Sequence, residues 1–139
     1  MKTRGLVHHI DLSVMDVARS RAFYEMVLGY MGYRLGHQSL TQFDFDLILP
    51  DGGFSSIGIR QARGENAKRG QDRYSPGMHH LAWRAESPAD VDAFHEFLKK
   101  NGVTILDAPA AYPEYGEGYY AVFFADPDGI KLEYVYKPS

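Results

Sequence analysis

The sequence predicts an α+β fold of two βαβββ modules, which form a curved, cleft-bearing sheet assembly with the helices on its outer face. Three observations predict this fold: an internal repeat, a short alternating strand that opens each copy, and a capped helix after each of these strands. The 139 residues suffice for one compact core. We therefore expect a single domain over 1–139, with module 1 at about 1–60, a linker at 61–77 and module 2 at about 78–137.

The internal repeat becomes visible when the sequence is shifted by 71 positions. Residues 7–12 (VHHIDL) then align with residues 78–83 (MHHLAW), and Phe23 aligns with Phe94. Four of the six histidines lie in the two matched doublets. Because one shift joins the doublets to a matched downstream aromatic residue, the pattern indicates a duplicated module.

Module 1 is expected to open with a strand at 6–14, in which polar and apolar residues alternate. Asp16 has the position of a helix N-cap and Gly29 that of a helix stop. The apolar face of the strand must pack on the apolar stripe of the helix, which consists of Val17, Phe23, Met26 and Val27. The open face of the sheet is then left with the polar residues of the strand, which are His9, Asp11 and Ser13.

Module 2 repeats this pattern with a strand at 78–84 and a helix that begins after Ser87, with Pro88 at its first position. The pair Asn101-Gly102 is expected to end this helix. Its apolar stripe consists of Val91, Phe94, Phe97 and Leu98. The open face of the strand carries His80, Ala82 and Arg84.

Three further strands are expected in each module, and tight turns of the sequences PDGG and DPDG precede the last strand of each. A turn-rich loop is expected at 107–118. The expected strands lie at about 32–39, 42–49 and 55–61 in module 1, and at about 103–106, 119–125 and 130–136 in module 2.

Two imidazoles and one carboxylate fall on the open faces of these strands. His9 and His80 match in the repeat, and Glu133 alternates with the apolar residues of the last strand. A lone histidine of this kind is more typical of a satisfied polar residue than of a ligand. Together the three predict a site for one divalent ion, with open positions for substrate or water. His8 and His79 point toward the helix side and are interpreted as packing residues or as groups that contact a ligand residue, not as ligands themselves.

Other polar and aromatic residues complete the predicted site. Asp11 is the candidate base, and Arg84 either binds a substrate carboxylate or pairs with Asp11 or Glu133. Tyrosines of the loop at 107–118 either close over a ligand or pack on the surface. The substrate-binding candidates are Arg84, Tyr112, Tyr115, Tyr119 and His37. The basic segment Arg60–Arg73 is more typical of a solvated linker than of an anion site.

Composition excludes several other classes of function. The absence of cysteine excludes a disulfide framework, a Cys-based zinc site and a thiol nucleophile. A net charge of −3 without a dense Lys/Arg stripe argues against a nucleic-acid partner. The apolar runs are shorter than the about 20 residues that cross a membrane, and the opening residues lack the apolar core of a signal peptide. We expect a cytoplasmic protein with a small-molecule substrate and no membrane partner.

Five motifs extend over nearly the whole chain: HIDLSVMD at 9–16, SRAFY at 20–24, VLG at 27–29, HLAWR at 80–84 and DPDGIKLE at 126–133. In these motifs the sequence resembles the vicinal oxygen chelate superfamily, which includes glyoxalase I, fosfomycin-resistance thiol transferases, extradiol dioxygenases and bleomycin-resistance proteins. The resemblance implies a homodimer and a divalent ion such as Fe²⁺, Mn²⁺, Zn²⁺ or Ni²⁺. It implies metal ligands at His9, His80, Glu133 and a position near Gly58.

The sequence departs from the family pattern at the fourth ligand position. Gly58 offers no side chain where glyoxalase-type members carry a carboxylate or an amide, and that group resembles the base of glyoxalase I. This departure argues against a lactoylglutathione lyase and leaves Asp11 or Glu133 as the substitute base. Asp11 also stands at the position where the fosfomycin transferases share a threonine. Its negative charge would be unfavourable beside the phosphonate of that substrate.

Two functions stay open at this point. One is a metal-dependent, glyoxalase-like enzyme that acts on a small oxygen-rich substrate by Lewis-acid catalysis, as a lyase or isomerase or as a dioxygenase. The other is a metal-free ligand-sequestering protein similar to bleomycin-resistance proteins, which hold a flat or cationic drug in an aromatic-lined dimer cleft. Retention of all three ligand types favours the enzyme.

Overall fold

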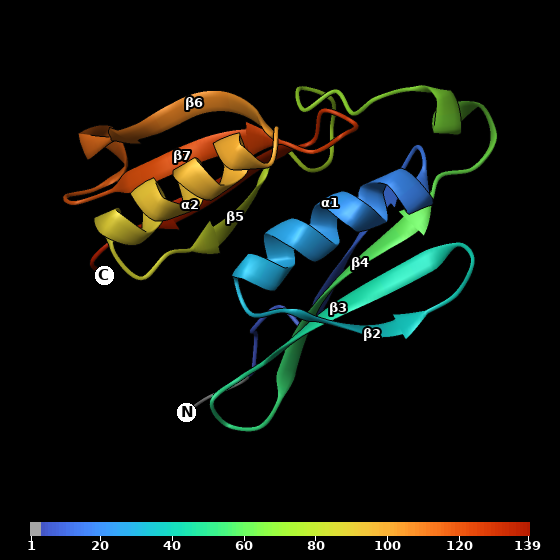
Figure 1. Cartoon of the computed structure of the whole chain (residues 1–139), viewed down its shortest axis with the longest axis horizontal. Coiled ribbons are helices and arrows are strands. Elements are labelled where there is room, and N and C mark those ends of the chain that lie inside the picture. The colour runs from blue at the N-terminus through green and yellow to red at the C-terminus, as the bar shows by residue number, and fades with distance from the viewer. Residues whose placement is uncertain (1–3) are drawn as a thin grey trace. The chain divides into compact units, whose positions relative to one another are not determined.

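A βαβββ module forms twice in the computed structural model, which describes residues 4–139 (Figure 1). Module 1 ends at Arg69, and module 2 runs from Gly70 to Ser139. Each module has a four-stranded sheet and one α-helix within the described residues. The predicted α+β class and the predicted pair of βαβββ modules are therefore confirmed.

Module 1 contains one strand, one helix and then three strands. Its sheet has the order β1-β4-β3-β2, in which β1 and β4 are parallel and the other neighbours are antiparallel. A short 3-10 helix follows the last strand at Gly64–Lys68. The elements are β1 (His9–Val14), α1 (Val17–Tyr30), β2 (Arg34–Gln38), β3 (Gln42–Ile48) and β4 (Phe54–Gln61).

Module 2 has the same topology, which supports the duplication seen in the sequence. Its sheet has the order β5-β8-β7-β6, and the pair β5–β8 is parallel. A short 3-10 helix, Pro113–Tyr115, lies between the strands β6 and β7. The elements are β5 (Leu81–Arg84), α2 (Pro88–Lys100), β6 (Thr104–Ala111), β7 (Tyr120–Ala125) and β8 (Lys131–Tyr136).

The helix caps agree with the sequence at both N-termini. The Asp16 carboxylate accepts hydrogen bonds from the backbone N–H groups of Ala18 and Arg19, and the Ser87 hydroxyl accepts one from Asp90. The predicted stop at Gly29 is wrong, because α1 continues to Tyr30. Gly32 supplies the left-handed backbone after the helix instead, with φ of 98°.

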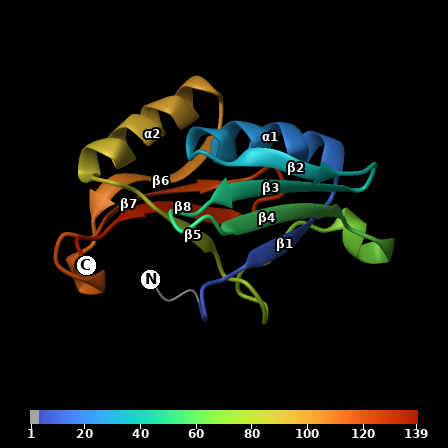
Figure 2. The ribbon, with the colours of Figure 1, turned by 90° about the horizontal axis from the view of Figure 1, so that it is seen from below.

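The core of each module lies between its helix and its sheet (Figure 2). In β1 the apolar residues Leu12 and Val14 are buried while the polar residues between them are exposed, as the alternation predicts. In α2 the side chains of Val91, Phe94 and Leu98 are fully buried. The predicted stripe of α1 is partly wrong: Phe23 is half-buried and its neighbour Tyr24 is fully buried.

Three strand boundaries differ from the predictions. The two opening strands begin later than expected, at His9 and at Leu81. The strand expected at 103–106 instead continues to Ala111, into the segment expected as a loop. It lies at the edge of its sheet, pairs with β7 through two register irregularities, and therefore tolerates Pro109 in its interior.

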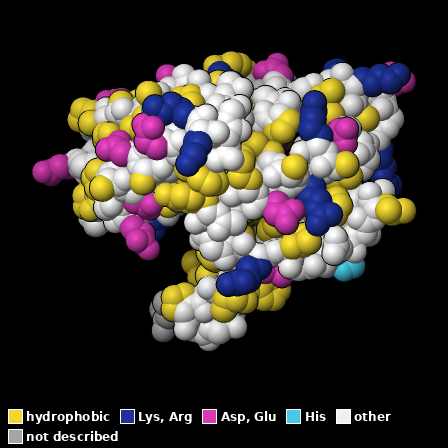
Figure 3. All heavy atoms as spheres, viewed as in Figure 1, with side chains coloured by type: hydrophobic (Ala, Val, Ile, Leu, Met, Phe, Trp, Pro, Cys, Tyr) yellow, Lys and Arg dark blue, Asp and Glu magenta, His cyan; other side chains and the backbone are white. Residues whose placement is uncertain are grey.

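Charged side chains of both signs are scattered over the face shown in Figure 3, among hydrophobic and other groups. Surface charges of mixed sign are typical of a solvated protein surface. Within residues 4–139, no helix combines the length and the apolar character needed to cross a membrane.

Two tyrosine hydroxyls tie the sheet of module 2 to α2. Tyr120 Oη donates to Asp92 Oδ1 at 2.6 Å, and Tyr134 Oη donates to Asp90 Oδ2 at 2.7 Å. The hydrogen bond to Asp92 is the main cause that raises the pKa of Tyr120, with a smaller part from burial. These hydrogen bonds hold α2 against the sheet of module 2.

We expect Tyr120→Phe to lower the free energy of unfolding by about 1 kcal/mol at pH 8. Because the pKa of Tyr120 is higher in the folded state, its hydrogen bond stabilises the fold fully below the unfolded-state pKa of about 10. This stabilisation is lost as the pH rises from there through the folded-state pKa. The difference between variant and wild type should therefore shrink above pH 10 in urea unfolding. Tyr136→Phe is the control, because Tyr136 lies opposite Tyr120 in the register. Equal effects of the two substitutions would contradict this role.

Candidate functional site

The module 2 part of the candidate site is a contact between an imidazole and a buried carboxylate. His80 Nε2 lies 3.0 Å from Glu133 Oε1. Glu133 is only 1% exposed, although it belongs to the open face of β8. The parallel pairing of β5 and β8 produces this contact, because it places Glu133 beside Ala82, two residues after His80. Two of the three predicted metal ligands therefore meet within one module.

Tyr119 holds the second oxygen of the same carboxylate. Its hydroxyl donates a short hydrogen bond to Glu133 Oε2. Burial raises the pKa of Tyr119, and the hydrogen bond to Glu133 raises it further. Tyr119 therefore stays protonated as a donor at neutral pH, and both carboxylate oxygens have partners. The sequence placed Tyr119 among substrate-binding residues and gave no sign of this bond.

The histidine doublets have a geometry that the sequence did not predict. His79 Nδ1 lies 2.8 Å from His80 Nδ1, and His8 Nδ1 lies 3.0 Å from His9 Nδ1. The packing role predicted for His8 and His79 is wrong, since both residues are exposed. Their rings meet those of His9 and His80 edge-on, which agrees with the other predicted role, contact with a ligand residue. Each contact uses Nδ1 of a predicted ligand, His9 or His80, and leaves Nε2 as the nitrogen that could bind a metal ion. A metal-binding histidine usually has its other ring nitrogen held in this way.

Desolvation is the main cause that lowers the pKa of His79, and the neighbouring His80 lowers it further. A neutral ring at this place can donate or accept through Nδ1, according to its tautomer. His79 therefore acts on the orientation of His80 and needs no positive charge to do so.

The module 1 part of the candidate site contains carboxylates around a glycine. Gly58 lies beside Asp11 of β1 and beside Asp44 of β3, in the place that Glu133 has beside Ala82. A Cβ atom added at Gly58 would collide with Asp11 Oδ1 and would lie 2.8 Å from Asp44 Oδ1. The carboxylates of two neighbouring strands thus fill the space of the missing fourth ligand.

Asp11 is held by Arg60, whose Nε donates to Asp11 Oδ2 at 2.9 Å. The assignment of Arg60 to a solvated linker is wrong, because this residue belongs to β4. The ion pair that was one of the alternatives for Arg84 is wrong, because Asp11 pairs with Arg60 and Glu133 pairs with His80. Arg84 is exposed at the end of β5.

A cavity of about 310 Å³ lies on this face of module 1. His9, Asp11 and Asp44 line it together with His37, which was predicted as a substrate-binding residue. The remaining predicted residues belong to an aromatic cluster of module 2. Tyr112 and Tyr115 are stacked with ring centroids 5.7 Å apart, and both contact the ring of Tyr119. Tyr115 is exposed, so this cluster offers an aromatic surface to a ligand.

Within residues 4–139, no group of three or more His, Asp or Glu side chains is close enough together to hold a metal ion. His9, on the exposed edge of β1, is the imidazole that the repeat supplies.

We expect Gly58→Ala to destabilise the protein by roughly 1–3 kcal/mol, because the added methyl group displaces the Asp11 carboxylate from Arg60. Gly29→Ala is the matched control, since a Cβ atom there meets nothing within 4 Å. At that helical position alanine should stabilise the protein by up to about 1 kcal/mol. Urea unfolding measures both, and a Gly58→Ala variant as stable as wild type would contradict the described packing.

Comparison with known proteins gives the same assignment over almost the whole chain. A model of the glyoxalase/bleomycin resistance protein/dioxygenase superfamily matches residues 6–134. The uncharacterized protein YqjT of Bacillus subtilis (strain 168) is 33% identical over 129 residues, which cover 93% of this chain and 97% of YqjT.

Solved structures share the fold. A provisionally assigned glyoxalase from Bacillus halodurans has a TM-score of 0.80 at 28% identity, with 96% of this chain and 97% of that chain covered. The lactoylglutathione lyase from Agrobacterium tumefaciens has a TM-score of 0.69 at 18% identity, with 97% and 96% covered, and shows the fold alone. The chain belongs to the glyoxalase/bleomycin resistance protein/dioxygenase superfamily.

Proposed function

We propose that this protein is a metal-dependent enzyme of the vicinal oxygen chelate type. His9, His80 and Glu133 would hold one divalent ion, and a small oxygen-rich substrate would bind beside it. The observation that carries the proposal is the 3.0 Å contact between His80 Nε2 and the buried Glu133 carboxylate. Ligands of one ion lie at about this separation from each other.

The donor set fits a divalent ion on chemical grounds. A nearly fully buried carboxylate needs a positive partner, and the hydrogen-bond partners of Glu133 within residues 4–139 are a phenol and an imidazole. Its hydroxyl partner Tyr119 fixes the carboxylate, and the contact with His79 fixes the His80 ring. Two imidazoles and one carboxylate suit Fe²⁺, Mn²⁺, Zn²⁺ or Ni²⁺.

The bound ion would supply Lewis-acid chemistry to adjacent oxygens of the substrate. The residues of the chain would orient the substrate and move its proton. Asp11, fixed by Arg60, is the base of this proposal, with Glu133 as the second candidate. Arg84, His37, Tyr112 and Tyr115 are the proposed substrate contacts. The reaction is that of a lyase or isomerase, or of a dioxygenase.

The aromatic cluster supports a second candidate function. The stacked pair of Tyr112 and Tyr115 offers a flat, partly exposed surface that suits a planar or cationic ligand. A metal-free protein that sequesters such a ligand would need this surface and no ion. Binding of a divalent ion separates the two candidates.

The test is metal analysis of protein made without a tag and reconstituted with each of the four ions. We expect close to one equivalent per chain, and loss of the ion together with activity in His9→Ala and His80→Ala. His95→Ala on α2 is the control and should retain the ion. Less than about a tenth of an equivalent in the wild type would overturn the proposal. Ligand binding that is unchanged in His9→Ala without any ion would establish the sequestering function.

A further inference from the structure

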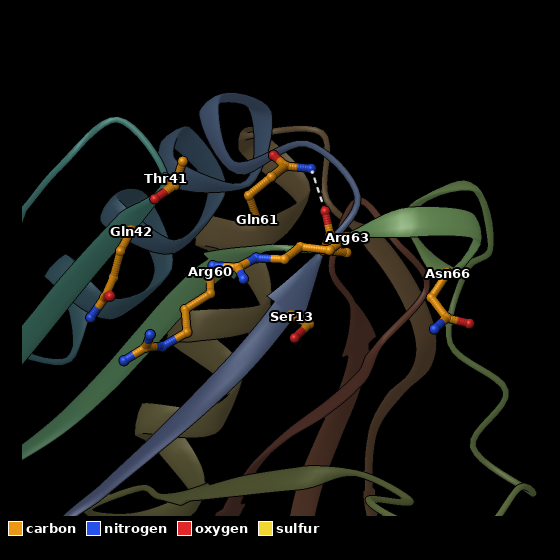
Figure 4. Close-up of a pocket in the computed structure, with 8 residues that line it drawn as sticks. Ser13, Thr41, Gln42, Arg60, Gln61, Arg63 and Asn66 are labelled. Atoms are coloured by element: carbon orange, nitrogen blue, oxygen red, sulfur yellow. Dashed lines mark hydrogen bonds between the residues drawn. The ribbon is translucent and has the colours of Figure 1, made fainter.

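A second cavity of module 1, of about 640 Å³, adjoins the first near the ends of β1 and β4 (Figure 4). Arg60 and Gln42 line both cavities. The charged residues of its lining are Arg60 and Arg63, and the others are neutral, including Ser13 and Asn66. The lining therefore carries two cations, of which Arg60 is paired with Asp11, in a chain whose net charge is −3.

Of the two guanidinium groups, that of Arg60 is paired with the Asp11 carboxylate. Figure 4 shows the Arg63 side chain extending toward Arg60, whose own side chain continues beyond it along the strands. Arg60 gives its Nε to Asp11, which leaves its terminal nitrogens as further donors. None of the ion pairs among residues 4–139 includes Arg63. An oxyanion bound in this cavity would accept charge-assisted hydrogen bonds from the guanidinium nitrogens.

The segment that carries the two arginines is fixed to the fold. Between them, Gln61 donates to the carbonyl of Met15 at 2.7 Å and accepts from the backbone N–H of Val17 at 3.1 Å. The backbone N–H of Ala62 donates to the carbonyl of Val14 at 2.8 Å. These bonds join the end of β4 to the start of α1, so both guanidinium groups extend from a held backbone.

We propose that this cavity is an oxyanion subsite, in which Arg60 and Arg63 bind a carboxylate or phosphate group of the substrate. Guanidinium groups match both kinds of oxyanion with paired hydrogen bonds. Ser13 and Gln42 add neutral donors at the cavity wall.

The subsite defines the class of substrate, a point that rests on the function proposed above. Ser13 follows His9 by four residues on the same face of β1, which corresponds to about 13 Å along the strand. The substrate would therefore be an elongated acid, with its reacting oxygens near His9 and its anionic group at Arg63.

The experiment is a titration of metal-free protein, followed by NMR amide shifts, with malonate, inorganic phosphate and neutral malonamide as probes. We expect malonate or phosphate to shift the amides around Arg60–Arg63, and malonamide to have no effect. Arg63→Gln should weaken binding about tenfold. Lys68→Gln is the control, because Lys68 is a nearby cation of the 3-10 helix that does not line the cavity. A stronger response to malonate or to phosphate identifies the kind of oxyanion.

Binding that is unchanged in Arg63→Gln, or that weakens equally in Lys68→Gln, would overturn the subsite. Arg63 is exposed, so its replacement should leave the fold intact. The titration needs no metal ion, which keeps the two proposals separable. Anion binding without metal binding would overturn the proposed enzyme and support the subsite. Metal binding without anion binding would support the proposed enzyme and overturn the subsite.

Discussion

Replacing Glu133 with alanine is expected to lower the affinity for the divalent ion more than about a hundredfold. Loss of a residue that merely hydrogen-bonds to a ligand already lowers metal affinity by about 10–100-fold. The substitution removes the carboxylate that faces His80 Nε2 and leaves the Tyr119 hydroxyl without its acceptor. Because Glu133 is almost fully buried, the protein should also lose about 1–3 kcal/mol of stability.

Glu133→Gln separates these two effects. The amide keeps the shape of the side chain and an oxygen that accepts from Tyr119, but it has no charge. We expect nearly wild-type stability together with the loss of the ion, as measured by urea unfolding and metal analysis. Glu86→Ala, an exposed carboxylate of the same module, is the control and should retain the ion. A Glu133→Gln protein that holds a full equivalent would show that this carboxylate is not a ligand.

Phe94→Ala is expected to destabilise module 2 by about 3–5 kcal/mol, the largest effect on stability that we predict. The Phe94 ring is fully buried in α2, with its centroid 4.5 Å from that of Tyr134 and 5.5 Å from that of Phe124. Removal of the ring would leave a cavity between helix and sheet that rigid strands cannot close.

Phe23→Ala is the matched control for Phe94→Ala. The two residues align in the repeat, but Phe23 is half-buried beside the fully buried Tyr24. We expect a clearly smaller loss of stability for Phe23→Ala in urea unfolding followed by circular dichroism. The fluorescence of Trp83, the single tryptophan, reports on module 2 directly. Equal losses for the two variants would contradict the burial described for the two helices.

Local signals in the sequence were enough to predict most of the fold. The caps at Asp16 and Ser87 and the alternation along β1 depend on neighbours in the chain, and these predictions are confirmed. The extension of β6 to Ala111 was missed, because a long strand with a proline is decided by its pairing with β7.

Pairing between strands also explains what the sequence could and could not predict about the site. The face of Glu133 follows from alternation within a strand, and the missing ligand at Gly58 was implied by the family resemblance. The approach of Asp44 to Gly58 depends on the register between β3 and β4, and the bond from Arg60 to Asp11 depends on the register between β1 and β4. Such partners far apart in sequence have no local signal.

The most direct measurement of the central proposal is anomalous diffraction from crystals grown with one equivalent of Zn²⁺ or Mn²⁺. We predict one strong peak per chain, about 2.0–2.3 Å from His80 Nε2, from Glu133 and from a His9 imidazole. A strong peak elsewhere, or none at His80 and Glu133 with the ion in excess, would contradict the account.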